Sequence, residues 1–230
     1  MVELDASASS ECQIAAFRVV GRSTPIVLVA ETNKSGCAKA GNYIDTWGRT
    51  VAFDVNLTRL WDRNTCFAGH YAYPVDSNDD GAAERIFVGR HLYDPGGNRI
   101  CTLEIGNTHA DGVVTGDLEP GRPGLEAVAA GATGLRGFNA ANCQLLWSVP
   151  QKTVVNPQTV TIARLDAGST ALSLVVQQKG TASNPYLYFL DAQGKVRSRY
   201  PRSTIDGSTP SQNANLDGAT GTDEVVFTYG

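Results

Sequence analysis

Short apolar runs separated by polar, glycine-rich turns make up most of this chain. The runs are strand-like, at a few residues each, and no apolar pattern with the 3.6-residue helical period continues for 11 or more residues. This pattern predicts an all-β protein. The runs that define it are residues 26–30, 86–88, 127–128, 172–176 and 225–227.

An acidic loop comes before four of these runs. The best-formed copy is residues 76–84, followed by the run 86–88. A second copy spans residues 117–126, and degenerate copies begin at Arg164 and Asn213. The copies recur with a drifting period of about 40–50 residues, which is typical of repeat architectures.

A second motif has the same period. It is a hairpin in which a mostly apolar pair is followed by Asp or Asn, a short turn and another strand. Its copies are centred on Asp54, Asp94, Asn139 and Asp191. Each repeat thus consists of a strand, an acidic loop, a strand, a hairpin and a strand, which is the pattern of a β-propeller blade.

The predicted fold is an all-β β-propeller of four-stranded antiparallel blades with Asp-rich calcium loops. About four to five blades are present, and they either close as a small propeller or form part of a larger one. Residues 1–230 are expected to be a single propeller domain or propeller fragment. The repeat units are roughly 11–62, 67–104, 109–148, 156–200 and 207–230.

Composition excludes some partners. The net charge is −4 at pH 7, which argues against nucleic acid because phosphate binding needs a basic face. No run of 18 or more apolar residues predicts a membrane span. Residues 1–10 lack the features of a signal peptide, and the chain stops directly after a strand-like run, so we expect a fragment of a longer protein. The oligomeric state is not indicated.

Five cysteines occur without C-x-x-C spacing, which disfavours zinc and thioredoxin-type sites. Because five is odd, at least one is free or pairs outside the chain. One or two disulfides and buried free thiols remain equal alternatives. The cysteines are Cys12, Cys37, Cys66, Cys101 and Cys143.

The first acidic loop has the spacing of a Ca²⁺ site. Oxygen-bearing side chains occupy positions 1, 3, 5 and 9, and glycine occupies position 6, where the chain must turn sharply. The alternative is a polar turn with scattered acids. The predicted ligands are Asp76, Asn78, Asp80, Ala82 and Glu84.

The other acidic loops are less regular. Arg122-Pro123-Gly124 interrupts the second loop. Arg164 at the first position of the third loop would repel a cation, so no metal is expected in the third loop. The fourth loop has about two extra residues. The predicted metal ligands are Asp117, Glu119 and Glu126 in the second loop, and Asn213, Asn215 and Asp217 in the fourth.

Three residues are candidates for chemistry. His70 lies six residues before Asp76, and Asp111 lies six residues before Asp117, with His109 two residues further upstream. In a propeller these positions start the innermost strand, so His70, His109 and Asp111 are predicted to converge at the mouth of the central funnel. The alternative is that they only line a wet channel or satisfy backbone groups. His91 is interpreted as structural.

Several stretches resemble the bacterial rhamnogalacturonan lyases that degrade the pectin backbone. They are residues 69–76 (GHYAYPVD), residues 106–117 (GNTHADGVVTGD) running on to 122–126 (RPGLE), and the hairpin at 50–61. The similarity is good over roughly residues 45–150. It implies an eight-bladed propeller with structural calcium ions, secretion or another extracytoplasmic location, and a calcium-assisted site in the funnel. By position, His70, His109 and Asp111 match that funnel cluster.

The function implied by the resemblance is an enzyme, a polysaccharide lyase that cleaves rhamnogalacturonan-type pectin by calcium-assisted β-elimination. Such a reaction needs the C5 proton of a uronate sugar made acidic by a cation at the carboxylate, and a base to remove it. The alternative is a non-catalytic, calcium-stabilised propeller that binds glycans or proteins. A truncated, inactive homologue is a third interpretation, because the family is about twice this length or more.

Overall fold

A computed structural model describes most of the chain. The described residues are 13–32, 47–67, 69, 72–106, 108–165, 172–179, 186–201, 211–214 and 224–227. Within them the regular structure is β-strand, with no α-helix and hence no helix long and apolar enough to cross a membrane. The chain divides into two compact units: Met1–Thr102 with Asn107–His109, and Leu103–Gly106 with Ala110–Gly230.

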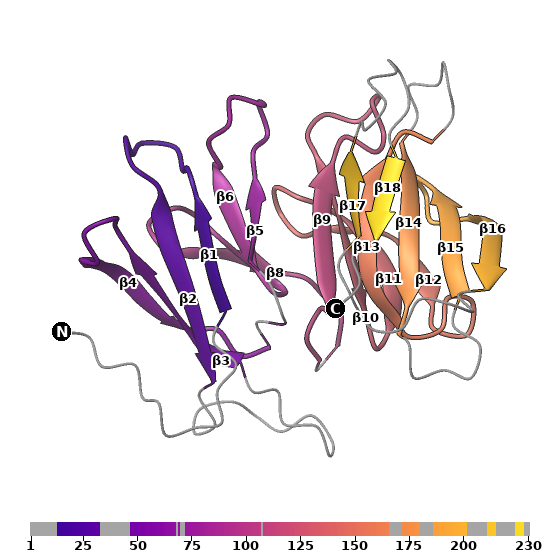
Figure 1. Ribbon diagram of the computed structural model, residues 1–230, viewed down its shortest axis with the longest axis horizontal. Helices are drawn as coiled ribbons and strands as arrows, with labels where there is room; N and C mark the ends of the chain where they lie inside the picture. Colours follow the sequence, from indigo (N-terminus) through magenta and orange to yellow (C-terminus); the bar gives the residue numbers. More distant parts are fainter. Residues whose placement is uncertain are drawn as a thin grey trace. The chain divides into compact units, whose positions relative to one another are not determined.

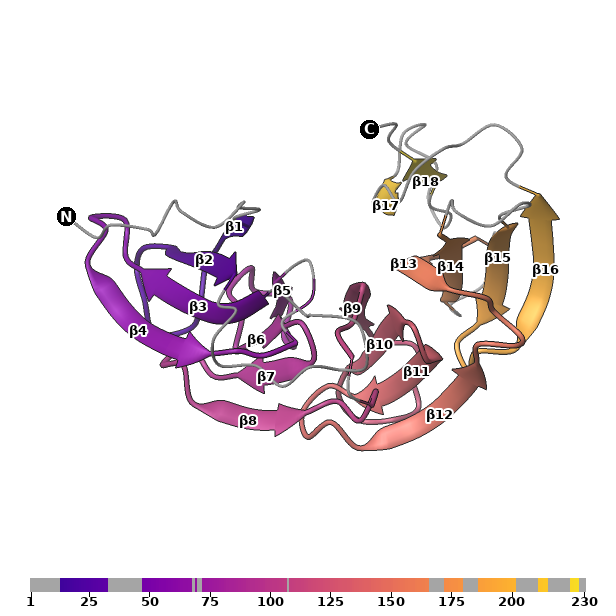
Figure 2. The ribbon, with the colours of Figure 1, turned by 90° about the horizontal axis from the view of Figure 1, so that it is seen from below.

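The first unit contains two four-stranded antiparallel sheets in chain order (Figures 1 and 2). Each strand pairs with the next one along the chain. One sheet is β1 (Gln13–Phe17), β2 (Ile26–Thr32), β3 (Trp47–Phe53) and β4 (Arg59–Asn64). The other is β5 (Ala72–Val75), β6 (Arg85–Val88), β7 (His91–Tyr93) and β8 (Arg99–Thr102).

The second unit repeats this plan and adds a two-stranded sheet. Its first sheet is β9 (Gly112–Gly116), β10 (Glu126–Gly131), β11 (Gly134–Asn139) and β12 (Leu145–Pro150). The next is β13 (Pro157–Ala163), β14 (Ser173–Gln178), β15 (Tyr186–Asp191) and β16 (Val196–Pro201), and the pair is β17 (Ser211–Ala214) and β18 (Glu224–Phe227). Four sheets of four antiparallel strands confirm the prediction of an all-β fold with blade-like repeats.

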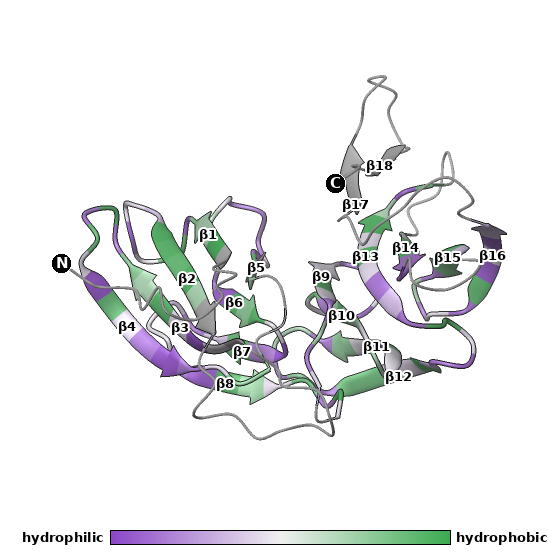
Figure 3. Ribbon diagram, turned by 60° about the horizontal axis from the view of Figure 1, so that its bottom comes forward, coloured by the Kyte–Doolittle hydropathy of each residue, from purple (hydrophilic) through white to green (hydrophobic). Residues whose placement is uncertain are grey.

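The second strand of each four-stranded sheet is more buried than the fourth. Every residue of β10 is buried, whereas β4 and β16 are partly or largely exposed. Figure 3 shows the same contrast, with β2 mainly hydrophobic and hydrophilic stretches on β4 and β16. An inner strand covered on both faces needs a continuous apolar run, and this is the pattern that predicted the strands.

Each unit has its own core between neighbouring sheets. In the first unit the core joins β2 and β3 to β6 and β7, through residues such as Ile26, Leu28 and Ile86. In the second it joins β10 and β11 to β13, β14 and β15, through residues such as Leu135 and Leu174. Neighbouring sheets therefore stabilise each other, as expected of stacked repeats.

The predicted hairpin motif has a clear physical basis. The Asp94 carboxylate accepts a hydrogen bond from the backbone N–H of Asn98 at 2.8 Å, and Asp191 does the same with Lys195 at 2.8 Å. Such Asx turns close the loop from within, which is why Asp or Asn recurs at this place. Asp54 accepts the equivalent bond from Thr58, and Asn139 accepts the N–H of Ala141, two residues further on.

A tryptophan from an outer strand lies on the hairpin of the next sheet in both units. Trp61 of β4 donates its indole N–H to the Pro95 carbonyl at 3.1 Å. A Cβ atom on Gly97, whose φ is 77°, would lie only 2.6 Å from the Trp61 ring. In the second unit, Trp147 of β12 lies in the same way against Gly194, where a Cβ would be 2.8 Å away. The glycines thus permit contact between sheet and hairpin.

The structure decides between the alternatives for three of the five cysteines. Cys66, Cys101 and Cys143 are disulfide-bonded. Cys12 and Cys37 lie outside the described residues. Disulfides of this kind persist in oxidising compartments and are rare in the cytosol.

His91 is a buried structural group, with 5% of its surface exposed. Its Nε2 lies 2.7 Å from the Cys66 carbonyl oxygen and its Nδ1 lies 2.9 Å from the Thr102 hydroxyl. A carbonyl can only accept, so Nε2 carries the proton and Nδ1 accepts from Thr102. Burial is the main cause that lowers the pKa of His91 to about 4.

We expect acid to weaken the first unit through His91. The folded-state pKa of about 4 lies below the value of 6.5 in the unfolded chain, so the stabilisation is complete above pH 6.5 and is lost as the pH falls toward 4. The loss should be about 2–3 kcal/mol in the free energy of unfolding. Urea unfolding at pH 7 and pH 4.5 measures it. In His91→Gln this contribution disappears; an unchanged pH slope in the variant would contradict the assignment.

Candidate functional site

The first acidic loop connects β5 to β6 and is held by its own side chains. Asp76 accepts the N–H of Gly81 at 2.7 Å, and Asp80 accepts the N–H of Ala82 at 2.8 Å. Asp79 and Gly81 both have positive φ, at 57° and 80°, which glycine and Asp tolerate better than most residues. The loop therefore folds back on itself and turns its carboxylates inward.

Three carboxylates converge in this loop. Asp76, Asp80 and Glu84 each place an oxygen within 4.8 Å of the others. Glu84 Oε2 accepts the backbone N–H of Ser77 at 2.7 Å and its hydroxyl at 2.8 Å, and these bonds hold the pKa of Glu84 below its usual value, the backbone bond being the larger cause. Glu84 Oε1 is buried and accepts no hydrogen bond from the described residues. Such a group suits a hard cation that binds through oxygen.

The other two predicted ligands lie beside Asp80. The Asn78 side chain accepts the Asp80 N–H at 3.1 Å and donates to the Asp80 carboxylate at 3.2 Å. Ala82 donates its N–H to Asp80, so its carbonyl is the atom that remains for a metal. The structure thus brings the three predicted acids together, and the metal-ligand roles of all five residues remain predictions.

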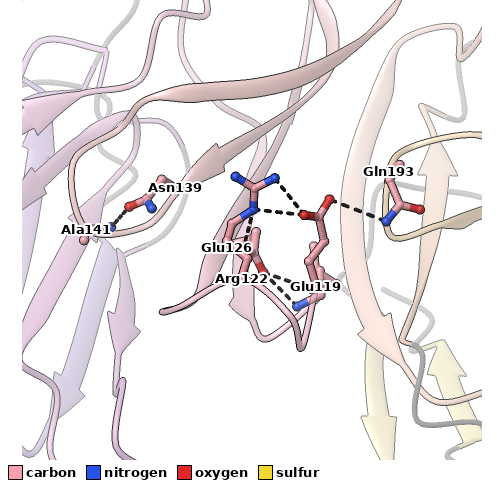
Figure 4. Close-up of polar contacts among 7 residues, drawn as sticks. Glu119, Arg122, Glu126, Asn139, Ala141 and Gln193 are labelled. Carbon is pink, nitrogen blue, oxygen red and sulfur yellow. Dashed lines mark hydrogen bonds and ion pairs between the residues drawn. The ribbon is translucent and has the colours of Figure 1, made fainter.

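The second acidic loop connects β9 to β10 and contains an ion pair. The Arg122 guanidinium lies 2.8 Å from the Glu119 carboxylate, and its Nε is 3.7 Å from Glu126 Oε1 (Figure 4). Glu126 is 1% exposed, and burial is the main cause that raises its pKa. In this part of the described chain, Asp117, Glu119 and Glu126 do not form a group of three converging ligands like that of the first loop.

The fourth predicted loop lies largely outside the described residues. Asn213 belongs to β17, and Asn215 and Asp217 fall outside. Their roles as metal ligands remain predictions.

The catalytic candidates are only partly described. His70 lies outside the described residues. His109, which is 8% exposed, belongs to the first compact unit, and Asp111 belongs to the second. The convergence of these residues remains a prediction.

Asp111 has an ordered environment within the second unit. Its carboxylate accepts the amide of Gln158 at 2.8 Å, and its backbone N–H donates to the Ala130 carbonyl at 2.8 Å. Gln158 lies on β13 and is 7% exposed. A buried amide of this kind fixes the direction of the carboxylate.

Gln158 was missed by the sequence analysis, although the signal was present. It lies six residues before Arg164, the first position of the third acidic loop, just as Asp111 precedes Asp117 and His70 precedes Asp76. The same repeat position thus carries a polar side chain in three consecutive units. Applying the spacing to the degenerate loop as well would have identified it.

Comparison with known proteins identifies the relatives of this chain. No family model matches it. Over 110 residues it is 36% identical to rhamnogalacturonan endolyase YesW of Bacillus subtilis (strain 168). Over these residues the chain is similar to a rhamnogalacturonan lyase. The match covers 42% of this chain and 17% of that enzyme, so it concerns one part of each.

Solved structures agree with the blade-like fold. The exotype rhamnogalacturonan lyase YesX matches 94% of this chain, with a TM-score of 0.62 and 19% identity. The rhamnogalacturonan lyase YesW matches 87% of this chain, with a TM-score of 0.60 and 20% identity. BBS1N, solved in complex with ARL6DN, matches 93% of this chain, with a TM-score of 0.60 and 12% identity. This chain spans 37% of YesX, 32% of YesW and 62% of BBS1N. At these identities the structural matches establish the fold alone.

Proposed function

We propose that this chain serves a polysaccharide lyase acting on rhamnogalacturonan-type pectin. The observation that carries the proposal is the 36% identity to a rhamnogalacturonan endolyase over 110 residues. The structural matches to two lyases of this class are consistent with it, because they extend the likeness over 94% and 87% of the chain. The disulfide-bonded cysteines fit a secreted or extracytoplasmic enzyme.

The proposed reaction is β-elimination at a uronate sugar. A base removes the C5 proton, the leaving glycosidic oxygen departs from C4, and the product carries a C4–C5 double bond. His70, His109 and Asp111 are the candidates for proton transfer. The bond from Gln158 would hold the Asp111 carboxylate in a fixed direction for that role.

Calcium is the proposed cation. A bound Ca²⁺ can neutralise a carboxylate and so acidify the neighbouring proton. Separately, among the described residues, the acids of the first loop are suited to hold a Ca²⁺ ion, with Glu84 Oε1 buried and without a hydrogen bond there. Because Asp76, Asp80 and Glu84 belong to a single loop between two strands, we assign this site a structural role.

Ultraviolet absorbance of the unsaturated uronyl product tests the lyase proposal. Incubation with rhamnogalacturonan should raise the absorbance, and hydrolysis would not. His109→Ala should reduce the signal while leaving the unfolding midpoint little changed. Binding of the polysaccharide without any product, in the wild-type chain as in the variant, would overturn the proposal.

The alternative is a calcium-stabilised binding module. It is favoured by the match to BBS1N, a protein of the same fold that was solved in complex with another protein. Under this alternative the chain binds a glycan or a protein, and His109→Ala leaves that binding unchanged. Equilibrium binding to the same polysaccharide therefore separates the two functions.

A further inference from the structure

The two acidic loops are closed by the same contact. In the first loop, Glu84 Oε2 accepts the backbone N–H of Ser77, the residue after the first acid, at 2.7 Å. In the second, Glu126 Oε2 accepts the backbone N–H of Leu118, again the residue after the first acid, at 2.9 Å. Glu119 adds a second N–H at 3.2 Å. The terminal glutamate thus fastens both loops.

The loops differ in the groups that surround this glutamate. Oε1 is buried in both Glu84 and Glu126, and in neither does it accept a hydrogen bond from the described residues. In the first loop the neighbouring groups are the acids Asp76 and Asp80. In the second loop the neighbouring group is a cation, because Arg122 Nε lies 3.7 Å from Glu126 Oε1. The terminal glutamate therefore lies among carboxylates in the first loop and beside a guanidinium in the second.

We propose that Arg122 is the resident cation of the second acidic loop and takes the place of a metal ion there. The guanidinium is always protonated and can contact two carboxylates at once. It lies 2.8 Å from Glu119 and 3.7 Å from the buried Glu126, so its single positive charge offsets part of the negative charge of the two acids. The loop is then closed without calcium, although its sequence predicts metal ligands.

The arrangement also ties the loop to the next sheet. Glu119 Oε1 accepts the side-chain amide of Gln193 at 3.4 Å, and Gln193 lies in the hairpin between β15 and β16. Figure 4 shows the Glu119 carboxylate between the Arg122 guanidinium and the Gln193 amide. A fixed cation therefore orients a carboxylate that reaches the neighbouring repeat.

Hydrogen–deuterium exchange of the whole chain tests the proposal, with Arg122→Gln as the variant. In wild type, exchange over residues 117–126 should change less than twofold between 5 mM Ca²⁺ and EDTA. In Arg122→Gln without calcium, exchange there should rise at least tenfold, because Glu126 loses its counter-charge. Calcium should reverse most of this rise, since the position becomes available to a metal ion.

Arg197→Gln is the matched control. It removes an exposed arginine that lies 3.6 Å from Asp191 in the same unit, and it should leave exchange over 117–126 unchanged. The proposal is overturned if Arg122→Gln exchanges like this control, or if calcium fails to reverse the rise. Should the variant not fold, chelation in wild type decides: a tenfold response over 117–126 refutes a resident cation. Exchange over residues 76–84 in Ca²⁺ and in EDTA tests calcium binding by the first loop independently. The calcium site of the first loop and the role of Arg122 in the second loop can therefore fail separately.

Discussion

Replacing Trp61 with alanine is expected to lower the free energy of unfolding of the first unit by about 3–5 kcal/mol. The side chain is 5% exposed, stacks at 6.2 Å on the ring of Tyr93 and donates to the Pro95 carbonyl. Truncation removes a large apolar contact and leaves a cavity between β4 and the β7–β8 hairpin. Urea unfolding of Trp61→Ala, with hydrogen exchange of residues 91–102 as a local readout, measures the loss.

Trp61→Phe and Gly97→Ala separate the parts of this contact. Phenylalanine keeps most of the ring but loses the bond to Pro95, so it should cost about 1–2 kcal/mol. Gly97→Ala keeps Trp61 but places a Cβ 2.6 Å from its ring at a φ of 77°, and should also destabilise. If Trp61→Ala and Trp61→Phe unfold at the same denaturant concentration, the ring does not hold the hairpin.

The contact of Trp61 shows what the sequence could predict and what it could not. The short apolar runs identified the strands, and the Asp and Asn positions identified the hairpins, because both depend on neighbours in the chain. The packing of Trp61 on Gly97 joins residues 36 positions apart on different sheets. Only the register of both sheets brings them together, and the sequence alone does not set that register.

The acidic loops show the same division. The spacing correctly predicted that Asp76, Asp80 and Glu84 lie close together, since residues of one tight loop are close both in sequence and in space. In the second loop, spacing could not reveal that Arg122 folds back onto Glu119, because a long side chain has many rotamers and the tertiary surroundings choose among them. The bond from Gln158 to Asp111 likewise spans two repeats.

Calcium is expected to raise the free energy of unfolding of the first unit by about 3–4 kcal/mol when free Ca²⁺ is 100–1,000 times its dissociation constant. The ion would bind the folded loop, where three carboxylates lie within 4.8 Å, and not the unfolded chain, where they are apart. Chemical unfolding in 5 mM Ca²⁺ and in EDTA measures this difference. Mg²⁺ should stabilise less, because it requires a smaller, octahedral site.

Glu84→Gln and Asp79→Asn make this prediction specific to the converging oxygens. Glu84→Gln preserves shape but removes one charge from the group of three, so the response to calcium should largely disappear. Asp79 lies in the same loop but outside that group, and Asn tolerates its φ of 57°. Asp79→Asn removes the same charge from the loop and should keep most of the response. If both variants lose the response to calcium equally, general electrostatic attraction to an acidic loop explains the binding. If the free energy of unfolding of the wild type is the same in Ca²⁺ and in EDTA, the loop is a polar turn that its own hydrogen bonds suffice to close.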